Sequence, residues 1–125
     1  MDAATLSTKL RRAGYVLAAT GVVYLWARYD VYDVPEIACS PVVGVAPGAR
    51  LLLDRWAKDV RSEDVLMFRD ESGMLHLGLV EDAPQPLAPG EVWIGGDDPA
   101  CPGYESADSG AVPKERIEAR VLVAF

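Results

Sequence analysis

Residues 90–125 read GEVWIGGDDPACPGYESADSGAVPKERIEARVLVAF and contain the clearest structural pattern in the chain. Residues 91–94 form a short apolar run of the kind that β-strands favour. Residues 95–110 are rich in Gly, Pro, Asp and Ser, which predicts a loop rather than the interior of a helix or strand. Residues 119–125 form a second apolar run. Two strands joined by a long loop predict a loop mounted on a sheet, where functional sites commonly lie.

Further strands are predicted along the rest of the chain. The stretches with the composition of strands or extended chain are residues 30–38, 49–55, 65–69 and 74–80. The first of them contains Pro35, which limits it to a connector or an edge strand. The turn signal Asp-Glu-Ser-Gly separates the last two, so we expect a β-hairpin there. Three prolines predict that residues 81–90, which follow, form a loop. Since these patterns are those of strands and the domain shows no convincing amphipathic helix, the sequence predicts a domain that is mainly β.

Charge divides the 125 residues into two parts. Residues 1–29 hold four basic side chains and one acidic one, a net charge of +3. Residues 30–125 hold 8 basic and 18 acidic side chains, a net charge of −10, which together with the first part gives −7. An acidic domain repels phosphate, so nucleic acid is not an expected partner.

Residues 13–27, AGYVLAATGVVYLWA, carry no charge and predict an N-terminal membrane helix. As a helix the stretch covers roughly 22 Å, which is less than the roughly 30 Å core of a bilayer. Arg12 and Arg28 flank it, and side chains of this length can extend to the headgroups. The basic flank places the N-terminus on the cytoplasmic or matrix side and the domain on the opposite side. The same residues also fit a buried helix or a cleaved targeting segment.

Several short motifs at the end of the chain match one known family. GEVWIGGDD at 90–98, GAVP at 110–113 and Arg120 resemble, in this order, the C-terminal box of the signal peptidase I family, above all its mitochondrial inner-membrane branch. Asp98 stands where Asn is usual, and ESA at 105–107 stands where the family has Asp-Ser-Arg. The resemblance implies a compact, coiled β-sheet domain, residues 30–125, behind one transmembrane helix within residues 1–29.

The resemblance also implies a serine nucleophile, activated by a Lys or, in one branch, by a His. Counting back from Pro47 and Gly48, Ser40 falls on the nucleophile, although Pro41 stands where the family has Met. A second alignment matches Cys39, Ser40 and Pro41 to the residues before the nucleophile, which would then be deleted. The other interpretation of Ser40 is an ordinary loop serine that caps a turn before proline.

The general base is expected on the strand at 74–80. No lysine occurs between Lys58 and Lys114, so a lysine base is absent. One alignment puts Gly78 at the base position and another puts His76 there. His76 is the only histidine and is a competent base near neutral pH. A single histidine on a strand also fits a hydrogen-bonded structural role.

The remaining polar residues indicate no cofactor. Ala107 cannot replace the Arg of the family's Asp–Arg ion pair, so we expect that loop to lie more openly. Four acidic residues nearby fit no calcium-loop spacing, so no metal site is expected; they are Asp97, Asp98, Glu105 and Asp108. Cys39 and Cys101 fit either two thiols or a disulfide, which by the resemblance would tie the nucleophile segment to the C-terminal loop.

The substitutions fall on the residues that carry chemistry and leave the glycines and prolines of the motifs in place. We therefore expect a membrane-anchored, non-catalytic relative of signal peptidase that acts as an accessory or structural subunit of a membrane-protein complex. The resemblance of GEVWIGGDD to the inner-membrane branch of the family implies an energy-transducing membrane, such as that of mitochondria. The alternative is an active membrane-bound serine endopeptidase with a Ser40–His76 dyad. Between them lies binding of an extended peptide without cleavage, along residues 34–39; a tethered β domain without an inherited site is the third reading.

Overall fold

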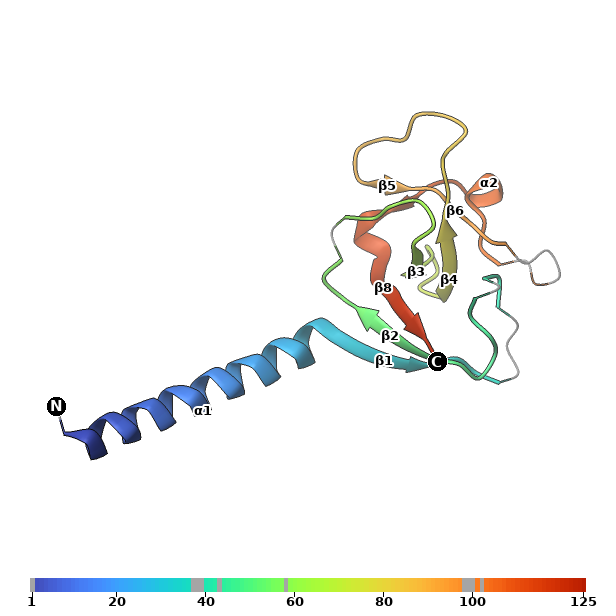
Figure 1. Ribbon diagram of the computed structural model, residues 1–125. Helices are drawn as coiled ribbons and strands as arrows, with labels where there is room; N and C mark the ends of the chain where they lie inside the picture. The colour runs from blue at the N-terminus through green and yellow to red at the C-terminus, as the bar shows by residue number, and fades with distance from the viewer. Residues whose placement is uncertain (1, 37–39, 43, 58, 98–100, 102) are drawn as a thin grey trace.

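A long helix projects from a β domain in the computed structural model of the chain (Figure 1). The structure describes all residues except 1, 37–39, 43, 58, 98–100 and 102. In chain order the elements are α1 (Ala3–Arg28), β1 (Tyr29–Asp33), β2 (Arg50–Asp54), β3 (Val65–Arg69), β4 (Leu75–Val80), β5 (Glu91–Val92), β6 (Ile94–Gly95), α2 (Ser106–Ser109), β7 (Val112–Pro113), the 3-10 helix η1 (Lys114–Arg116) and β8 (Ile117–Ala124).

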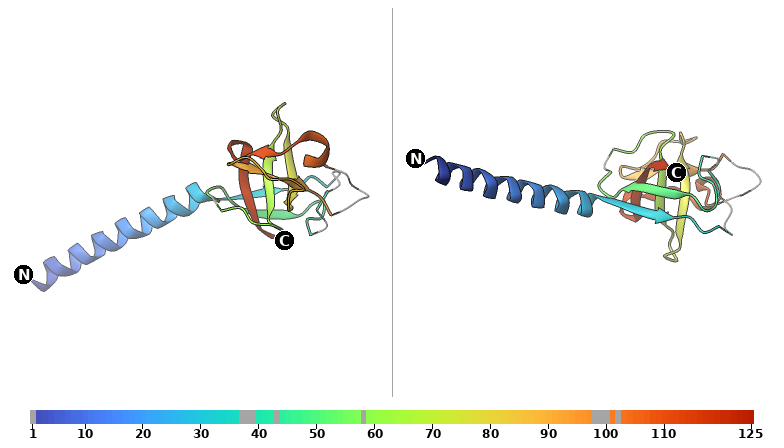
Figure 2. Two further views of the ribbon diagram at one scale, coloured as in Figure 1. Left: turned by 90° about the horizontal axis from the view of Figure 1, so that it is seen from above. Right: turned by 60° about the horizontal axis from the view of Figure 1, so that its bottom comes forward.

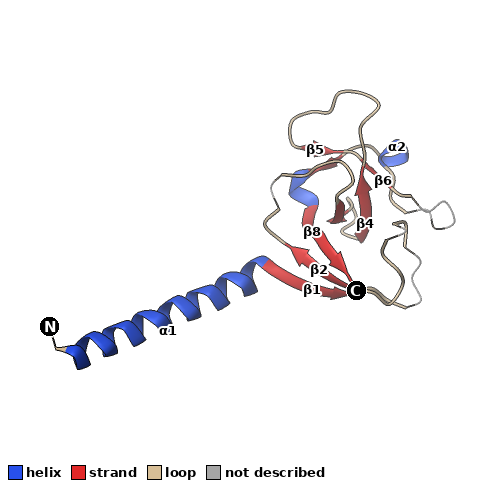
Figure 3. Cartoon of the chain, in the orientation of Figure 1, coloured by secondary structure: helices blue, strands red, loops and turns tan. Residues whose placement is uncertain are grey.

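The main sheet has six antiparallel strands in the order β1-β2-β8-β3-β4-β6, and β5 and β7 form a second, two-stranded sheet. Figure 3 shows that loops make up much of the domain around these strands. The chain as a whole is therefore mixed rather than mainly β, because α1 is its longest element. The expectation of a β domain holds for the residues that follow α1.

β3 lies at the centre of the domain and is buried on both faces. Leu66 and Phe68 pack into one apolar cluster with residues of β4, β6 and β7, whereas Met67 packs into another with residues of β2 and β8. Successive side chains of a strand point to opposite faces, so a strand between two clusters must be apolar throughout. This explains the continuous run Val-Leu-Met-Phe at the start of β3.

Most of the predicted strands are confirmed, including the β3–β4 hairpin. The run at 91–94 is not one strand: it breaks at Trp93, whose carbonyl accepts the amide of Glu81, and its two halves join different sheets. The loop predicted at 95–110 contains the short helix α2, whose Ser109 amide donates to the Glu105 carbonyl. Both differences come from contacts with distant or adjacent backbone groups that composition does not encode.

α1 begins ten residues earlier than the apolar stretch that predicts it. Residues 3–12 contain no Gly or Pro and are rich in Ala, Leu, Lys and Arg, which favour helix. No side chain of α1 is buried, and both views in Figure 2 show it standing away from the domain. Within the described residues, no helix combines the length and the apolar character needed to span a bilayer.

The joint between α1 and β1 is built on the buried carboxylate of Asp54. Arg28, the last residue of α1, donates to it from Nε (3.1 Å) and Nη2 (3.0 Å). The Trp56 amide also donates to it at 3.0 Å, and Arg120 of β8 forms an ion pair at 3.8 Å. The hydrogen bonds from Arg28 lower the pKa of Asp54 despite its burial. The end of α1 is thereby fixed to β2 and β8.

Gly78 allows β4 to pack closely against β6. A Cβ atom at this position would overlap Ile94 Cγ2 and lie 3.1 Å from Phe68 Cε1. Both neighbours are buried and have little room to move. We predict that Gly78→Ala lowers the free energy of unfolding by about 1–3 kcal/mol through overpacking. Urea unfolding of the detergent-solubilised chain, followed by near-UV circular dichroism, measures this.

The matched control is Gly44→Ala. Gly44 has no heavy atom within 4 Å of where its Cβ would lie, and its φ is not left-handed. We expect it to unfold at the wild-type urea concentration. Equal stability of the two variants would show that the contact between Gly78 and Ile94 is not tight.

Candidate functional site

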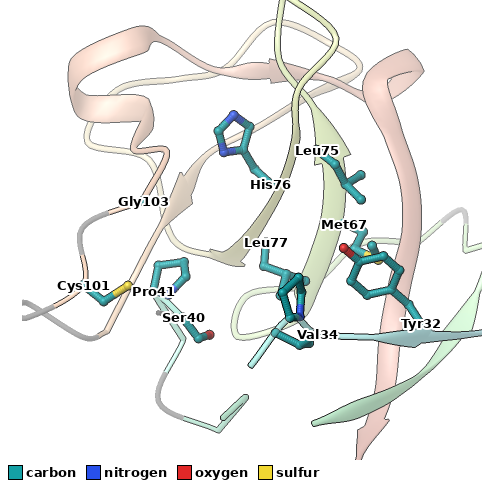
Figure 4. Close-up of a pocket in the computed structure, with 11 residues that line it drawn as sticks. Tyr32, Val34, Ser40, Pro41, Met67, Leu75, His76, Leu77, Cys101 and Gly103 are labelled. Carbon is teal, nitrogen blue, oxygen red and sulfur yellow. The ribbon is translucent and has the colours of Figure 1, made fainter. Parts of the chain in front are cut away.

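Ser40 and His76 both line a cavity of about 310 Å³ on one side of the sheet (Figure 4). The segment before β2 contributes Ser40 and Pro41 to its wall. The other lining residues come from β1, the residues just after it, the β3–β4 hairpin and the C-terminal loop: Tyr32, Val34, Pro35, Met67, Leu75, Leu77, Cys101 and Gly103. The sheet therefore brings together the two segments that the resemblance assigns to chemistry.

The hydroxyl of Ser40 is engaged by its own turn. Ser40 is 7% exposed, and its Oγ donates to the Val42 carbonyl at 3.0 Å. The Val42 amide donates back to the same oxygen at 3.3 Å. This is the turn-capping arrangement that the sequence offers as the alternative to a nucleophile. A nucleophilic serine would instead need a hydrogen bond to a general base.

Pro41 sits between two glycines of the C-terminal segment. A Cβ on Gly96 would lie 2.8 Å from the Pro41 carbonyl oxygen, and one on Gly103 would lie 2.9 Å from the Pro41 ring. The Asp97 amide donates to the same carbonyl at 3.0 Å. Gly96 and Asp97 are the Gly-Asp pair of the matched motif. In this chain the pair serves to hold the Ser40–Pro41 turn in place.

The His76 ring points to the face of β4 that lies away from the cavity's apolar floor. Leu75 and Leu77 pack toward the cluster that contains Val34 and Met67. His76, between them in sequence, contacts the rings of Phe68 and Tyr104, with centroid distances of 5.7 and 5.5 Å. Alternation along the strand requires this opposition. Figure 4 shows the ring directed away from Ser40.

Asp70 holds His76 from the turn of the hairpin. Its Oδ2 lies 2.7 Å from His76 Nε2, while Oδ1 accepts the Ser72 hydroxyl (2.6 Å) and the amides of Ser72 and Met74. These hydrogen bonds, with Ser72 first and His76 second, hold the pKa of Asp70 well below its usual range. Asp70 thus orders the hairpin turn and the histidine together.

No hydrogen bond joins Ser40 to His76 in the part of the chain that the structure describes; their bonds run to Val42 and Asp70. The dyad therefore stays a prediction, placed on one cavity but not connected. The alignment that puts Gly78 at the position of the general base gives no dyad either, because Ile94 fills the space beside Gly78. A side chain at that position has no path to Ser40 without moving β6.

The segment at 105–107, which stands where the family has Asp-Ser-Arg, has a structural role. Ser106 is buried, and its Oγ accepts the Ile94 amide at 2.8 Å, which ties α2 to β6. Ala107 is exposed. The side chains that the structure describes include no group of three or more that could hold a metal ion. Cys101 is disulfide-bonded, and Cys39 lies outside the described residues.

No protein-family model matches the sequence, and no curated protein matches it. The chain's own residues are therefore the evidence for its function.

The sequence did not point to Asp70 or Tyr104 as neighbours of His76. The hairpin register pairs Phe68 with His76 and Arg69 with Leu75. Asp70 follows directly at the turn, so the predicted hairpin could have indicated its contact with His76. Tyr104 comes from a distant loop and carries no local signal.

We predict that Asp70→Asn destabilises the chain at pH 7, and that the loss shrinks as the pH falls. The folded-state pKa of Asp70 lies below its unfolded value, which is about 3.9. Below about pH 5 the unfolded state takes up the proton first, so wild type loses this stabilisation as the pH falls toward the folded pKa. Urea midpoints at pH 7, 5 and 3 (about two units apart) measure the effect.

Glu71→Gln is the control for this prediction. The Glu71 side chain is 88% exposed and forms a long ion pair with Arg116, at 3.8 Å. We expect its urea midpoint to follow that of wild type at every pH. A constant difference between Asp70→Asn and wild type across the same range would contradict the assigned role of the Asp70 carboxylate.

Proposed function

We propose that this chain is a membrane-anchored, signal-peptidase-like protein without catalytic activity. It acts as an accessory or structural subunit of a complex in an energy-transducing inner membrane, such as that of mitochondria. The observation that carries the proposal is α1, a helix with an uncharged second part and no buried side chain that is fixed to a folded domain. The choice of membrane rests on the sequence resemblance to the inner-membrane peptidases.

The apolar side chains of α1 are distributed around the whole helix. Val16, Leu17, Val22 and Leu25 point in different directions at 100° per residue, and each is more than half exposed. A helix that is apolar on every side is normally surrounded by lipid or by other apolar helices. The domain covers none of these side chains. Something outside the described residues of this chain is therefore needed to cover them.

The dimensions of α1 favour a place among other membrane helices. Its 26 residues extend roughly 39 Å, but the uncharged stretch at 13–27 supplies only roughly 22 Å of that length. A short apolar stretch is accommodated by local thinning, by extension of Arg12 and Arg28 to the headgroups, or by association with neighbouring helices. The last route requires partner subunits, which supports the accessory role. The basic flank favours an N-terminus on the cytoplasmic or matrix side.

The geometry of the cavity supports a non-catalytic domain. The Ser40 hydroxyl is bonded to Val42, and the His76 ring is bonded to Asp70 on the opposite face of β4. A serine peptidase of this type requires a hydrogen bond between nucleophile and base, directly or through one water. Neither residue is oriented for that bond.

An active endopeptidase is the second candidate, because Ser40 and His76 share a cavity and Asp70 orients the histidine. Binding of an extended peptide without cleavage is compatible with either candidate. Among the described strands β1 pairs with β2 alone, so its outer edge is open to an added strand. The sequence predicts a peptide-binding edge at residues 34–39. Val34 exchanges backbone hydrogen bonds with Ala49 and Gly48, and residues 37–39 lie outside the described part of the chain.

We predict that the full chain resists alkaline carbonate extraction from membranes and purifies in mild detergent with other subunits at fixed stoichiometry. Leu17→Lys should abolish both properties, because a lysine at the centre of a membrane helix costs about 2.5–3.5 kcal/mol. Thr8→Lys, in the polar first part of α1, should leave both unchanged. Quantitative mass spectrometry of the purified material measures the stoichiometry.

Ser40→Ala separates the two candidate functions. The accessory role predicts that this variant keeps its subunits and that neither it nor wild type cleaves a signal-peptide substrate. Cleavage by wild type that is lost in Ser40→Ala would establish the endopeptidase instead. Release of wild type by carbonate would remove the membrane part of the proposal, whatever the cleavage assay gives.

A further inference from the structure

We infer that the α1–β1 joint lies at the lipid–water interface and that Trp56, on the loop after β2, contacts lipid there beside α1. The inference rests on the proposed membrane placement of α1 and adds a second contact, made by the domain itself. It fixes which end of the β domain faces the membrane.

Aromatic side chains from two distant parts of the sequence meet at the joint. The rings of Tyr24 on α1 and Trp56 pack edge to face, with centroids 5.4 Å apart. Both remain close to half exposed, at 43% and 46%, and Trp26, two residues after Tyr24, is 78% exposed. Exposed Tyr and Trp side chains gathered at one level of a helix are typical of the membrane–water interface.

Cationic side chains lie at the same level. Arg28 is the last residue of α1, and Arg55 directly precedes Trp56. The Arg55 side chain is 45% exposed and is held by Asp30 at 2.7 Å, next to the start of β1. Arginine at an interface can contact lipid phosphates, and anionic headgroups attract it. Each of these arginines is paired with a carboxylate, Arg28 with Asp54 and Arg55 with Asp30, so the charges at this end balance. The domain as a whole is strongly acidic, so anionic headgroups repel this end less than the rest.

The loop is held rigidly in this position. Asp54 bonds Arg28 through both of its oxygens and also accepts the Trp56 amide. The carboxylate therefore sets the position of Trp56 relative to the last turn of α1. When α1 enters a bilayer up to Arg28, the Trp56 ring is brought to the same depth as Tyr24.

The chain carries a natural set of probes, since it has three tryptophans. Trp26 lies on α1, Trp56 at the joint, and Trp93 between β5 and β6, strands that stand apart from the joint in Figure 1. Three full-length variants, each with one tryptophan kept and the other two replaced by Phe, are reconstituted in phosphatidylcholine–phosphatidylglycerol vesicles. Fluorescence quenching is then compared for lipids brominated near the headgroup and deep in the acyl chain.

We expect Trp56 and Trp26 to be quenched by the shallow bromines more than by the deep ones, because both lie within the last turns before Arg28, and Trp93 to be quenched by neither. Quenching of Trp26 without Trp56 would overturn the inference and leave the membrane anchor intact. Absence of quenching at both positions would overturn the inference and the proposed anchoring together. Should a variant with two tryptophans replaced fail to fold, Trp56→Phe alone gives the same answer as a loss of shallow-quenched emission relative to wild type.

Discussion

The buried carboxylate of Asp54 is the interaction on which the rest of this structure depends. A carboxylate that is almost fully inaccessible to solvent is tolerated only when its oxygens are hydrogen-bonded and a cation lies beside it. Arg28 from α1, the Trp56 amide and Arg120 from β8 meet these requirements. Removing one partner of such a pair typically costs about 3–5 kcal/mol, and less where, as with Arg28, the partner is partly hydrated. The Arg28–Asp54 pair therefore fixes the end of α1 to β2, so that the helix is held in a defined orientation relative to the sheet.

Three glycines of the domain, one of them in a matched motif, have a packing role that is independent of catalysis. Gly96 and Gly103 allow the Pro41 ring and carbonyl to approach the C-terminal segment, and Gly78 allows β4 to approach β6. Each position excludes a Cβ because of a contact made within the domain. Gly96, which belongs to the matched motif, would have this packing role in an active enzyme and in a non-catalytic protein alike. Its presence does not discriminate between the two, and the function must be judged from Ser40 and His76.

The features that sequence could predict are those encoded by neighbours along the chain. The β3–β4 hairpin follows from two apolar runs and the turn between them, and the helix follows from an uncharged stretch. The break at Trp93 and the burial of Ser106 depend on backbone groups of Glu81 and Ile94 that meet only after folding. For His76 the alternation with Leu75 and Leu77 was visible, but the sequence does not state which face of the strand meets Ser40. That single unknown separates a candidate dyad from two unconnected residues.

The alternation of side chains along β4 also indicates the free-energy cost of joining Ser40 and His76 by a hydrogen bond. Freeing the Ser40 hydroxyl from Val42 gives up a hydrogen bond worth about 0.5–1.5 kcal/mol, which a substrate could offset. Bringing the His76 ring to the other face of β4 requires a one-residue slip of the strand, which moves every side chain of β4 to the opposite face. Leu75, Leu77 and Leu79 would then leave their apolar cluster, and His76 would lose Asp70, Phe68 and Tyr104. Exchanging three partly buried leucines for one polar contact is unfavourable, since full burial of a leucine contributes about 1.5–3 kcal/mol and each of the three would lose a part of that. The energetics of the hairpin thus favour a domain that keeps His76 where it is.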